Sequence, residues 1–561
     1  MFCGIIIKKY QSSNNKILKF ILMVLKNTKI ICTIGPATES IRKLRHLIKA
    51  GMNCARLNFS HGTYEHHAKL IRNVRAVSEK MDEPIAIIQD LQGPRIRIGE
   101  LPEDGVEIKR GEEVVLAYEK AAGSLFAPLS LTWIRTEKSD PAAGIGSDKA
   151  ASKSDKAASK SDKAASKSDK AASKSDKAAS KSDKAASKSD KATQIILPTQ
   201  ENLGRIVKKG EIILIKDGLV RLRAISVLGA CVKARVEQGG VITSNRGINL
   251  PESKITNVVI TKKDKEDLKF GLKQKVDWIA LSFVRDKSDV EHLRGLLPKG
   301  KSYQPKIIAK IERKEAVENF DAILAASDAI MVARGDLGIE LPAEEIPLLQ
   351  KEFIEKCLKA SKPVIVATQM LESMTTNSRP TRAEVSDVAN AVIDHTDAVM
   401  LSSETSTGKY PIATCQMMRN IIIETEESPY DDDVKTRGTN KSIVPNIIAH
   451  TAEDIVGNDH IRAIVVMSSS GKSAQLIASE RPSVPVIALT QNDVSRKQMA
   501  LIWGVRPFIM KRQRNVDDLI QSTVKLVKRE LKVKKGDKII IASGHPTGPH
   551  GSLNLLKIHT V

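Results

Sequence analysis

The stretch KIIAKIERKEAVENFDAILAASDAIMVARGDLGIELP, residues 306–342, decides the fold class of this chain. It opens with a short apolar run at 306–311, continues with a helix-periodic segment, and ends with a second apolar run at 329–334. That order predicts a strand, a helix and a second, parallel strand. Lys310 and Glu312 stand two residues apart near the end of the first run, so they share one strand face. A cation and a carboxylate there are not ordinary core residues.

The same alternation of apolar runs and longer helix-periodic segments continues through most of the chain. Eight such runs with helices between them predict an α/β protein with a (β/α)8 TIM barrel. In that fold the chemistry lies where the strands end and the loops begin. The eight runs are 29–34, 54–59, 85–90, 277–283, 306–311, 329–334, 363–368 and 397–402.

The barrel is interrupted between its third and fourth runs. Residues 99–252 hold short apolar runs broken by Gly and polar turns, which predicts an inserted antiparallel β domain, a lid over the barrel. Within it, 147–192 repeat the heptad SDKAASK, six full copies followed by SDKA. The heptad has no large apolar residue and places two lysines at i, i+4, so we expect a disordered tether. A basic tail for nucleic acid or an acidic surface remains the alternative.

The remaining boundaries follow from composition. We expect residues 1–22 to be a dispensable, disordered extension, with Met23 as a possible start. The barrel should occupy 23–98 and 253–428, followed by a polar linker at 429–440. Residues 441–561 alternate again, in the runs AIVVMSS, PVIALT, RPFIM and DKIIIAS, and predict a separate C-terminal α/β domain.

Composition narrows the function classes. The net charge of +23 suggests anionic small substrates or nucleic acid, but only 3% of residues are aromatic, which weighs against a base-stacking surface. The six cysteines are scattered without a C-x-x-C pair, so we expect a reducing, cytoplasmic setting and no disulfide framework. The N-terminal apolar patch is far shorter than a spanning helix, so no membrane association is expected.

Polar residues gather at the ends of five predicted strands, and in a closed barrel these ends meet at one rim. The rim would bring cations beside carboxylates that can hold Mg²⁺, an arrangement suited to phosphoryl transfer. Structural salt bridges are the alternative for any single pair. These residues are Arg56, Asn58, Ser60, Asp90, Lys310, Glu312, Gly335, Asp336 and Thr368.

From about residue 28 to the C-terminus, leaving aside the repeat, the chain closely resembles pyruvate kinases. The resemblance implies a barrel with an inserted lid and a C-terminal regulatory α/β domain. It also implies the glycolytic transfer of a phosphoryl group from phosphoenolpyruvate to ADP, in a cytoplasmic, allosteric homotetramer. The segments that carry it are TKIICTIGPAT, CARLNFSHGTYEHH, QDLQGPRIRIGE, KIIAKIE, IMVARGDLGIELP and KPVIVATQMLESMTTNSRPTRAEVSDVANAV.

The resemblance also implies residue roles. Lys310 would stabilise the phosphoryl group in transfer, and Glu312 and Asp336 would hold Mg²⁺ or Mn²⁺. Arg56 would contact the substrate phosphate. The backbone amides of Gly335 and Asp336 with Thr368 would bind the substrate carboxylate, and Thr368 would also lie near the enolate proton donor, which places Lys310, Arg56 and Thr368 in the catalytic set. The implied nucleotide contacts are Arg97, Arg246 and Asp217.

Two features besides the repeat in the lid depart from the family pattern, and one further loop matches a loop that often holds a phosphorylated effector in the family. Asn58, Ser60, Asp90 and Leu91 match a potassium site, but Leu91 replaces a threonine and Arg95 replaces a glutamate. We therefore expect a K⁺-independent enzyme, with Arg95 paired to Asp90 in place of the ion. His395 and Ser403 stand where the family usually has glycines. The loop 468–473, composed of Ser468, Ser469, Ser470, Gly471, Lys472 and Ser473, is a candidate phosphate-effector site or an ordinary capped helix start.

Three other functions remain to be weighed against this one. A phosphate-binding barrel of different chemistry would keep the charged rim but lack the segment around 368–388. A catalytically dead homologue would lack Lys310, Glu312 or Asp336, and all three are present. A nucleic-acid binder would need a basic patch interleaved with aromatic residues, which the sequence does not contain.

Overall fold

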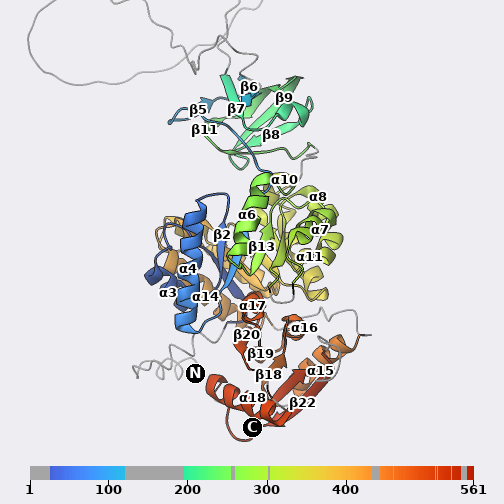
Figure 1. Ribbon diagram of the computed structural model, residues 1–561. Coiled ribbons are helices and arrows are strands. Elements are labelled where there is room, and N and C mark those ends of the chain that lie inside the picture. Colours follow the sequence, from blue (N-terminus) through green and yellow to red (C-terminus); the bar gives the residue numbers. More distant parts are fainter. Residues whose placement is uncertain are drawn as a thin grey trace, which may run out of the picture.

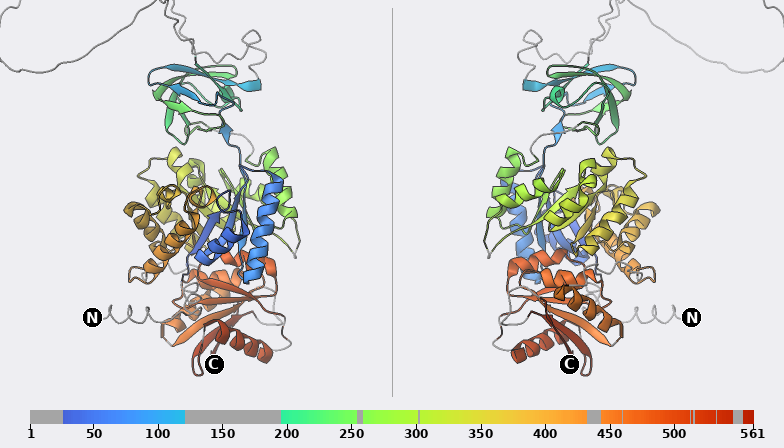
Figure 2. Two further views of the ribbon diagram at one scale, coloured as in Figure 1. Left: turned by 90° about the vertical axis from the view of Figure 1, so that its left-hand side faces the viewer. Right: turned by 90° about the vertical axis from the view of Figure 1, so that its right-hand side faces the viewer.

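The computed structural model describes residues 26–120, 195–253, 259–300, 303–431, 443–458, 460–511, 513, 516–531, 533–544 and 553–561. The described part forms three bodies stacked along one axis, with the β lid above the barrel and the C-terminal domain below it (Figure 1). The two side views show the same order (Figure 2). The expected extension 1–22, the repeat 147–192 and the linker from 432 onward lie outside the described residues.

The predicted barrel is confirmed. Eight parallel strands close in the order β1-β17-β16-β15-β14-β13-β3-β2, and each coincides with one of the eight apolar runs. The strands are β1 (Lys29–Thr33), β2 (Met52–Asn58), β3 (Ala86–Asp90), β13 (Trp278–Leu281), β14 (Lys306–Ile311), β15 (Ala329–Ala333), β16 (Val364–Ala367) and β17 (Ala398–Leu401).

Helices surround this barrel, and several begin at side-chain caps that the sequence provides. Thr261 and Asp264 form a reciprocal capping box at one helix, and Thr381 and Glu384 form another. The surrounding helices are α3 (Ile41–Ala50), α4 (Tyr64–Met81), α6 (Lys262–Lys273), α7 (Lys287–Leu296), α8 (Lys314–Glu318), α9 (Phe320–Ala326), α10 (Arg334–Glu340), α11 (Ile346–Lys359), α12 (Arg382–Ile393), α13 (Ser403–Ser406) and α14 (Pro411–Glu426), with the 3₁₀ turn η2 (Glu372–Thr375).

Alternation along each strand divides the barrel into two cores. In β14, Ile307, Ala309 and Ile311 pack outward against the helices, whereas Ile308 belongs to the cluster inside the barrel. Lys310 has the same parity as Ile308 and therefore points inward near the strand's carboxyl end. Because side chains in a strand alternate with a period of two, Lys310 and Glu312 share one face.

The lid is a nearly closed β barrel with its own apolar core. Its seven-stranded sheet has the order β4-β12-β8-β9-β10-β6-β7, and β11 pairs with β5 beside it. A bridge between Ile98 and Thr199 connects the two ends of the larger sheet. The strands are β4 (Ile96–Arg97), β5 (Val106–Ile108), β6 (Glu113–Tyr118), β7 (Ile195–Thr199), β8 (Ile212–Ile215), β9 (Val220–Leu228), β10 (Cys231–Gln238), β11 (Gly240–Ile242) and β12 (Gly247–Asn249).

Two expectations for the lid need correction. The domain is not wholly antiparallel, because β6 and β7 pair in parallel. Parallel neighbours need a long connection, and the 76 residues from 119 to 194, which include the repeat, provide one. The lid sheet also begins before the expected boundary at residue 99, because β4 pairs with β12.

The C-terminal domain is a five-stranded sheet in the order β20-β19-β18-β21-β22. Four strands match the predicted runs, but β22 was not predicted; it is an antiparallel edge strand with mostly exposed side chains. The elements are β18 (Ile461–Met467), β19 (Val486–Thr490), β20 (Val505–Ile509), β21 (Lys538–Ser543), β22 (Leu555–Thr560), α15 (Val444–Asn458), α16 (Lys472–Ser479), α17 (Asp493–Gln498), η3 (Met499–Leu501) and α18 (Val516–Leu531).

This domain closes the lower end of the barrel. Ala500 and Leu501 of η3 join the apolar cluster inside the barrel. Arg481 pairs with Asp397 immediately before β17, at 3.3 Å, and its guanidinium lies over the Trp503 ring. The amino ends of the barrel strands are therefore a docking surface, which leaves the opposite rim for chemistry.

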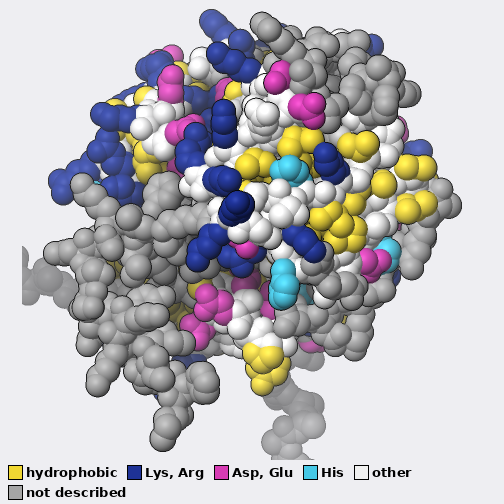
Figure 3. All heavy atoms as spheres, turned by 90° about the horizontal axis from the view of Figure 1, so that it is seen from below, with side chains coloured by type: hydrophobic (Ala, Val, Ile, Leu, Met, Phe, Trp, Pro, Cys, Tyr) yellow, Lys and Arg dark blue, Asp and Glu magenta, His cyan; other side chains and the backbone are white. Residues whose placement is uncertain are grey.

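The surface agrees with the basic composition. Seen from below, Lys and Arg side chains gather on one side of the described surface, with carboxylates scattered among them (Figure 3). Among the described residues, no helix combines the length and apolarity that a membrane crossing would require.

Candidate active site

Asp90, at the carboxyl end of β3, is the centre of the charged rim. Its Oδ2 accepts from Arg56 Nε at 2.6 Å, and its Oδ1 lies 3.4 Å from Lys310 Nζ. Arg56 also donates to Thr33 Oγ1 at 3.0 Å. Burial alone would raise the pKa of Asp90, but Lys310 and Arg56 lower it below its usual range. Ion pairs thus join β2, β3 and β14 at the rim, and the hydrogen bond to Thr33 adds β1.

Lys310 lies between two carboxylates. Its Nζ is 2.7 Å from Glu312 Oε1 and donates to Ser282 Oγ at 2.8 Å. Burial opposes the charged form, yet Asp90 and Glu312 outweigh it and raise the pKa of Lys310. The lysine is therefore a fixed, water-poor cation near the mouth of the barrel.

Ser282 and Phe283 are site residues that the sequence analysis did not single out. Ser282 Oγ contacts both Lys310 Nζ and the carbonyl of Leu91, the latter at 2.8 Å. Phe283 adopts a left-handed φ of 57° and donates its backbone N–H to Glu312 Oε2 at 2.7 Å. Ser282 follows Trp278 and Ala280 at period 2, so counting inward-facing positions along this run would have found it.

Glu312 and Asp336 are the two carboxylates that the sequence analysis expects to hold the metal. Glu312 is buried and Asp336 lies in the first turn of α10. Burial raises the pKa of Glu312, Lys310 counteracts this, and the charge of Asp336 raises it further. Two carboxylates that repel each other in a buried site form an oxygen-only donor set, so the residues present fit a hard divalent cation.

Thr368 and Gly335 are in direct contact. The backbone N–H of Gly335 donates to Thr368 Oγ1 at 2.7 Å, and a Cβ at Gly335 would lie 3.2 Å from that oxygen. Thr368 and Gln369 both adopt left-handed backbone angles, with φ of 69° and 55°. Arg334 supports this turn by donating to the Thr368 carbonyl at 2.9 Å. Two successive strained residues indicate a turn that the surrounding structure holds in place.

The candidate nucleotide residues belong to the lid and its hinge. Arg97 donates to the Asn245 carbonyl at 2.9 Å, and the exposed Arg246 donates to Thr243 Oγ1 at 2.8 Å. Asp217 is 64% exposed, in a left-handed turn between β8 and β9. Gly218 of the same turn faces Ile339 of α10, where a Cβ would approach to 3.9 Å. The turn therefore lies above the helix that carries Asp336.

The expected Arg95–Asp90 pair is wrong. Arg95 Nη2 instead bonds Asp217 Oδ1 at 2.9 Å, because the chain turns at Gly93 and leaves the barrel for the lid. Of the other candidate potassium ligands, Asn58 Oδ1 accepts from the Ser60 N–H at 3.1 Å. Leu91 is buried, and its carbonyl accepts from Ser282.

Positive charge nevertheless surrounds this part of the rim. Burial and then the charges of Arg97, Arg95, Arg56 and Lys263 all lower the pKa of His61. Four cations that reach one histidine define a basic zone between the barrel rim and the lid hinge.

The candidate effector loop lies at the other end of the molecule, before α16. Gly471 has a φ of 85°, and a Cβ there would meet Met499 Cγ at 3.0 Å, so glycine fits both the backbone and the space. Ser468 and Ser473 are buried. Burial lowers the pKa of Lys306 at the base of β14, and the charge of Lys472 lowers it further. The loop is therefore in electrostatic reach of a barrel strand.

His395 and Ser403 occupy different surroundings. His395 has a left-handed φ of 64° just after α12, and its N–H bonds the Val392 carbonyl while that of Thr396 bonds Ala391. This is the helix-ending turn in which glycine is usual. Ser403 begins α13 and donates to Glu372 Oε1 at 3.0 Å. Neither side chain contacts the rim residues in the described structure.

Comparison with known proteins agrees with this architecture. The family model described as "Pyruvate kinase, barrel domain" matches residues 25–127 and 157–415, and "Pyruvate kinase, alpha/beta domain" matches 446–559. The chain is 38% identical to a pyruvate kinase of Geobacillus stearothermophilus, over 96% of this chain and 80% of the relative. It is 36% identical to that of Sporosarcina psychrophila and 37% to those of Staphylococcus aureus strains, over 96% of this chain and 81% of each relative. The chain belongs to the pyruvate kinase family of phosphotransferases.

Proposed function

We propose that the rim transfers the phosphoryl group of phosphoenolpyruvate to ADP, giving pyruvate and ATP, with Lys310 at the centre of the reaction. The observation that carries this proposal is the buried Lys310 between Asp90 and Glu312. A cation fixed there is oriented before the substrate arrives, so it stabilises transition-state charge without reorganisation.

The substrate is positioned by its two anionic ends. Arg56 and Lys310 contact the phosphoryl oxygens, and the Gly335 and Asp336 backbone amides with Thr368 bind the carboxylate. The bond between phosphorus and the enol oxygen breaks as a bond to the terminal phosphate oxygen of ADP forms. The resulting enolate then takes up a proton from water at its methylene carbon, beside Thr368. The strained turn at Thr368 supports this assignment, because strain of this kind is retained at functional sites.

Glu312 and Asp336 would hold the divalent metal, Mg²⁺ or Mn²⁺. When bound, the ion would supply positive charge that neutralises the charge developing on the phosphoryl group in transfer. Phe283 N–H and Lys310 fix the two oxygens of Glu312 in position for this role.

ADP would enter from the basic zone below the lid. Arg97 and Arg246 contact its phosphates, and Asp217 faces the cleft from the lid turn. The lowered pKa of His61, caused first by burial and then by Arg97, Arg95 and Arg56, supports a zone that attracts anions.

We further propose that turnover does not depend on K⁺. The Asp90 oxygens already engage Arg56 and Lys310, and the Leu91 carbonyl accepts from Ser282. A further cation would compete with these groups and with the surrounding positive charge.

Assembly and regulation follow from family membership. We propose a homotetramer, which light scattering coupled to size exclusion would test. The apolar side chains Leu555 and Ile558 on the edge strand β22 support contact with a second copy. We also propose that the loop 468–473 binds a phosphorylated effector, although a plain helix cap remains the alternative.

One coupled assay tests the chemistry. Pyruvate formation from phosphoenolpyruvate and ADP is followed through lactate dehydrogenase, in a buffer of bulky organic cations, with and without KCl. We expect Mg²⁺-dependent turnover that KCl leaves unchanged. The losses in Glu312→Gln and Asp336→Asn should be partly recovered at high Mn²⁺. Strong activation by K⁺ alone would contradict the second proposal, and no turnover under any condition would contradict the first.

A further inference from the structure

A second group of side chains that could hold a metal ion lies far from the rim, on α15 of the C-terminal domain below the barrel (Figure 1). His450, Glu453 and Asp454 of α15 each offer one ligand atom, and these atoms all lie within 4.8 Å of one another. Positions i, i+3 and i+4 share one helix face, so the helix itself brings an imidazole and two carboxylates together. The group mixes nitrogen and oxygen donors, unlike the oxygen-only pair at the rim.

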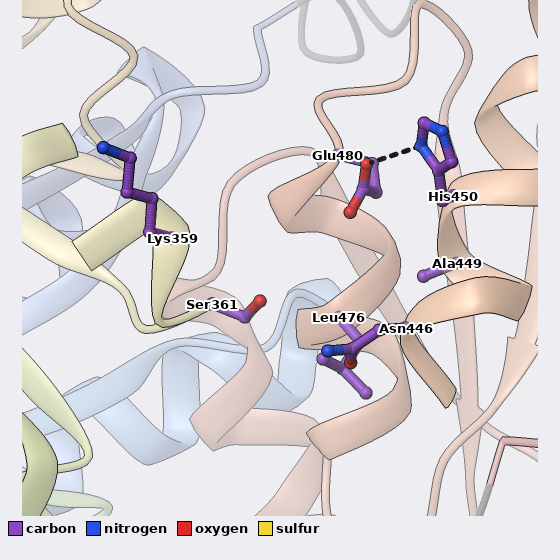
Figure 4. Close-up of a pocket in the computed structure, with 7 residues that line it drawn as sticks. All are labelled: Lys359, Ser361, Asn446, Ala449, His450, Leu476 and Glu480. Carbon is purple, nitrogen blue, oxygen red and sulfur yellow. Dashed lines mark hydrogen bonds and ion pairs between the residues drawn. The ribbon is translucent and has the colours of Figure 1, made fainter. Parts of the chain in front are cut away.

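A fourth residue orients the histidine. Glu480, which ends α16, places Oε2 at 3.3 Å from His450 Nδ1 (Figure 4). The other ring nitrogen, Nε2, lies 3.5 Å from Asp454 Oδ2. When Nδ1 donates its proton to Glu480, Nε2 keeps a lone pair directed toward Asp454. A carboxylate behind a ligating histidine is the usual support of a metal-bound imidazole.

The spacing suits a small dication. Ligand distances of 2.0–2.1 Å place neighbouring donors of a tetrahedral site about 3.3 Å apart. The separation of 3.5 Å between His450 Nε2 and Asp454 Oδ2 is close to this, and a carboxylate oxygen of Glu453 lies within 4.8 Å of the other ligand atoms.

A small cavity adjoins the group. It has a volume of about 20 Å³, enough for one water molecule, and Ser361, Asn446, His450 and Glu480 contribute to its wall, whereas Glu453 and Asp454 do not. Lys359 also lines it, but this side chain points away from His450 (Figure 4) and pairs with Glu355.

We propose that His450, Glu453 and Asp454 bind a transition-metal dication, Zn²⁺ by ligand type, with Glu480 as the positioning residue. Imidazole nitrogen selects Zn²⁺ over Mg²⁺, so this site differs in preference from the rim. All three ligands lie on α15, and the contact between His450 and Glu480 connects this helix to the end of α16. Ser479 and Gln475 of α16 bond Ser361 of the barrel, so the site stabilises the side of the domain that faces the barrel.

The test is calorimetric titration of the full chain with ZnCl₂ in millimolar Mg²⁺, which occupies the rim. We expect one Zn²⁺ site that His450→Ala abolishes and that Glu480→Gln weakens about tenfold to a hundredfold. His292→Ala, which removes an exposed helical histidine of α7, is the matched control and should bind as the unmodified chain does. Anomalous diffraction at the zinc edge should show the ion beside His450.

Asp454→Asn guards against a folding artefact, because Asp454 is 51% exposed and its loss should not disturb the core. This variant should fold, as circular dichroism would show, and should lose at least tenfold in Zn²⁺ affinity. Equal Zn²⁺ binding by the unmodified chain and the His450 and Asp454 variants would overturn the proposal. So would zinc density at Glu312 and Asp336 alone.

Discussion

Two lysines of one strand, Lys306 and Lys310, have pKa values that shift in opposite directions at the two ends of the barrel. Both have the inward parity of β14, at its base and its rim. Burial lowers the pKa of Lys306, and Asp328 only partly counteracts this, while its ammonium lies 5.3 Å from the Trp278 ring centre. Burial acts on Lys310 too, but Asp90 and Glu312 raise its pKa. Burial alone does not mark a functional cation; paired carboxylates at the carboxyl end of the strands do.

The largest expected effect comes from exchanging each lysine for methionine. Lys310→Met should lower kcat about a thousandfold or more, with a smaller change in substrate affinity, because its charge acts in the transition state. Lys306→Met should change kcat less than about tenfold. Steady-state kinetics of both variants measures the contrast. Similar losses in the two would show that the rim has no special role.

A serine at each end extends the comparison. Ser282→Ala should lower kcat about tenfold to a hundredfold with little change in KM, because Lys310 loses a hydrogen bond that orients it. The matched control is Ser327→Ala at the base, where the hydroxyl bonds the Ile323 carbonyl. This variant should lose stability but not kcat. If Ser282→Ala retains full kcat, Ser282 does not position the lysine.

A buried lysine at the amino end of the barrel strands, Lys29, should affect how the stability of the protein depends on pH. Burial, with a smaller effect of Lys26, lowers the pKa of Lys29 from 10.5 to about 7, and its Nζ donates to the Val505 carbonyl. Between these values the unfolded chain holds a proton that the folded chain has released. Stability should therefore rise with pH in that window, by up to about 1.4 kcal/mol per unit from this group.

Urea unfolding across pH 7–10 measures this slope. Lys29→Met should flatten it, whereas Lys69→Met, on the exposed face of α4, should leave it as it is. An unchanged slope in Lys29→Met would show that the buried lysine keeps its proton.

The smallest effect concerns backbone strain at the base. His395 occupies a left-handed position after α12, where a Cβ is unfavourable. His395→Gly should be about 1 kcal/mol more stable than His395→Ala, since both lack the ring and only alanine keeps the Cβ. Thermal and urea unfolding of the pair give the difference, and kcat should match in both. Equal stability would mean that the turn relaxes.

Local pattern explains how much could be predicted. The eight runs identified the barrel because a short apolar run between helix-periodic segments predicts a buried parallel strand from its local sequence alone. The period of two then placed Arg56, Asp90 and Lys310 on inward faces that converge wherever a barrel closes. The short lid strands β4 and β12, and the exposed edge strand β22, gave no such pattern, because few of their residues alternate between core and solvent.

The sequence by itself determined the barrel, the inserted lid and the charged rim, because strand and helix periods are local. Only the tertiary structure decided which groups meet across long separations. Arg95 turns away with the chain at Gly93 and bonds Asp217, 122 residues on, so its nearness to Asp90 in sequence misled. His450 contacts Glu480 only because α15 and α16 pack together. Such contacts depend on the path of the loops, and the strand and helix periods of the sequence do not predict that path.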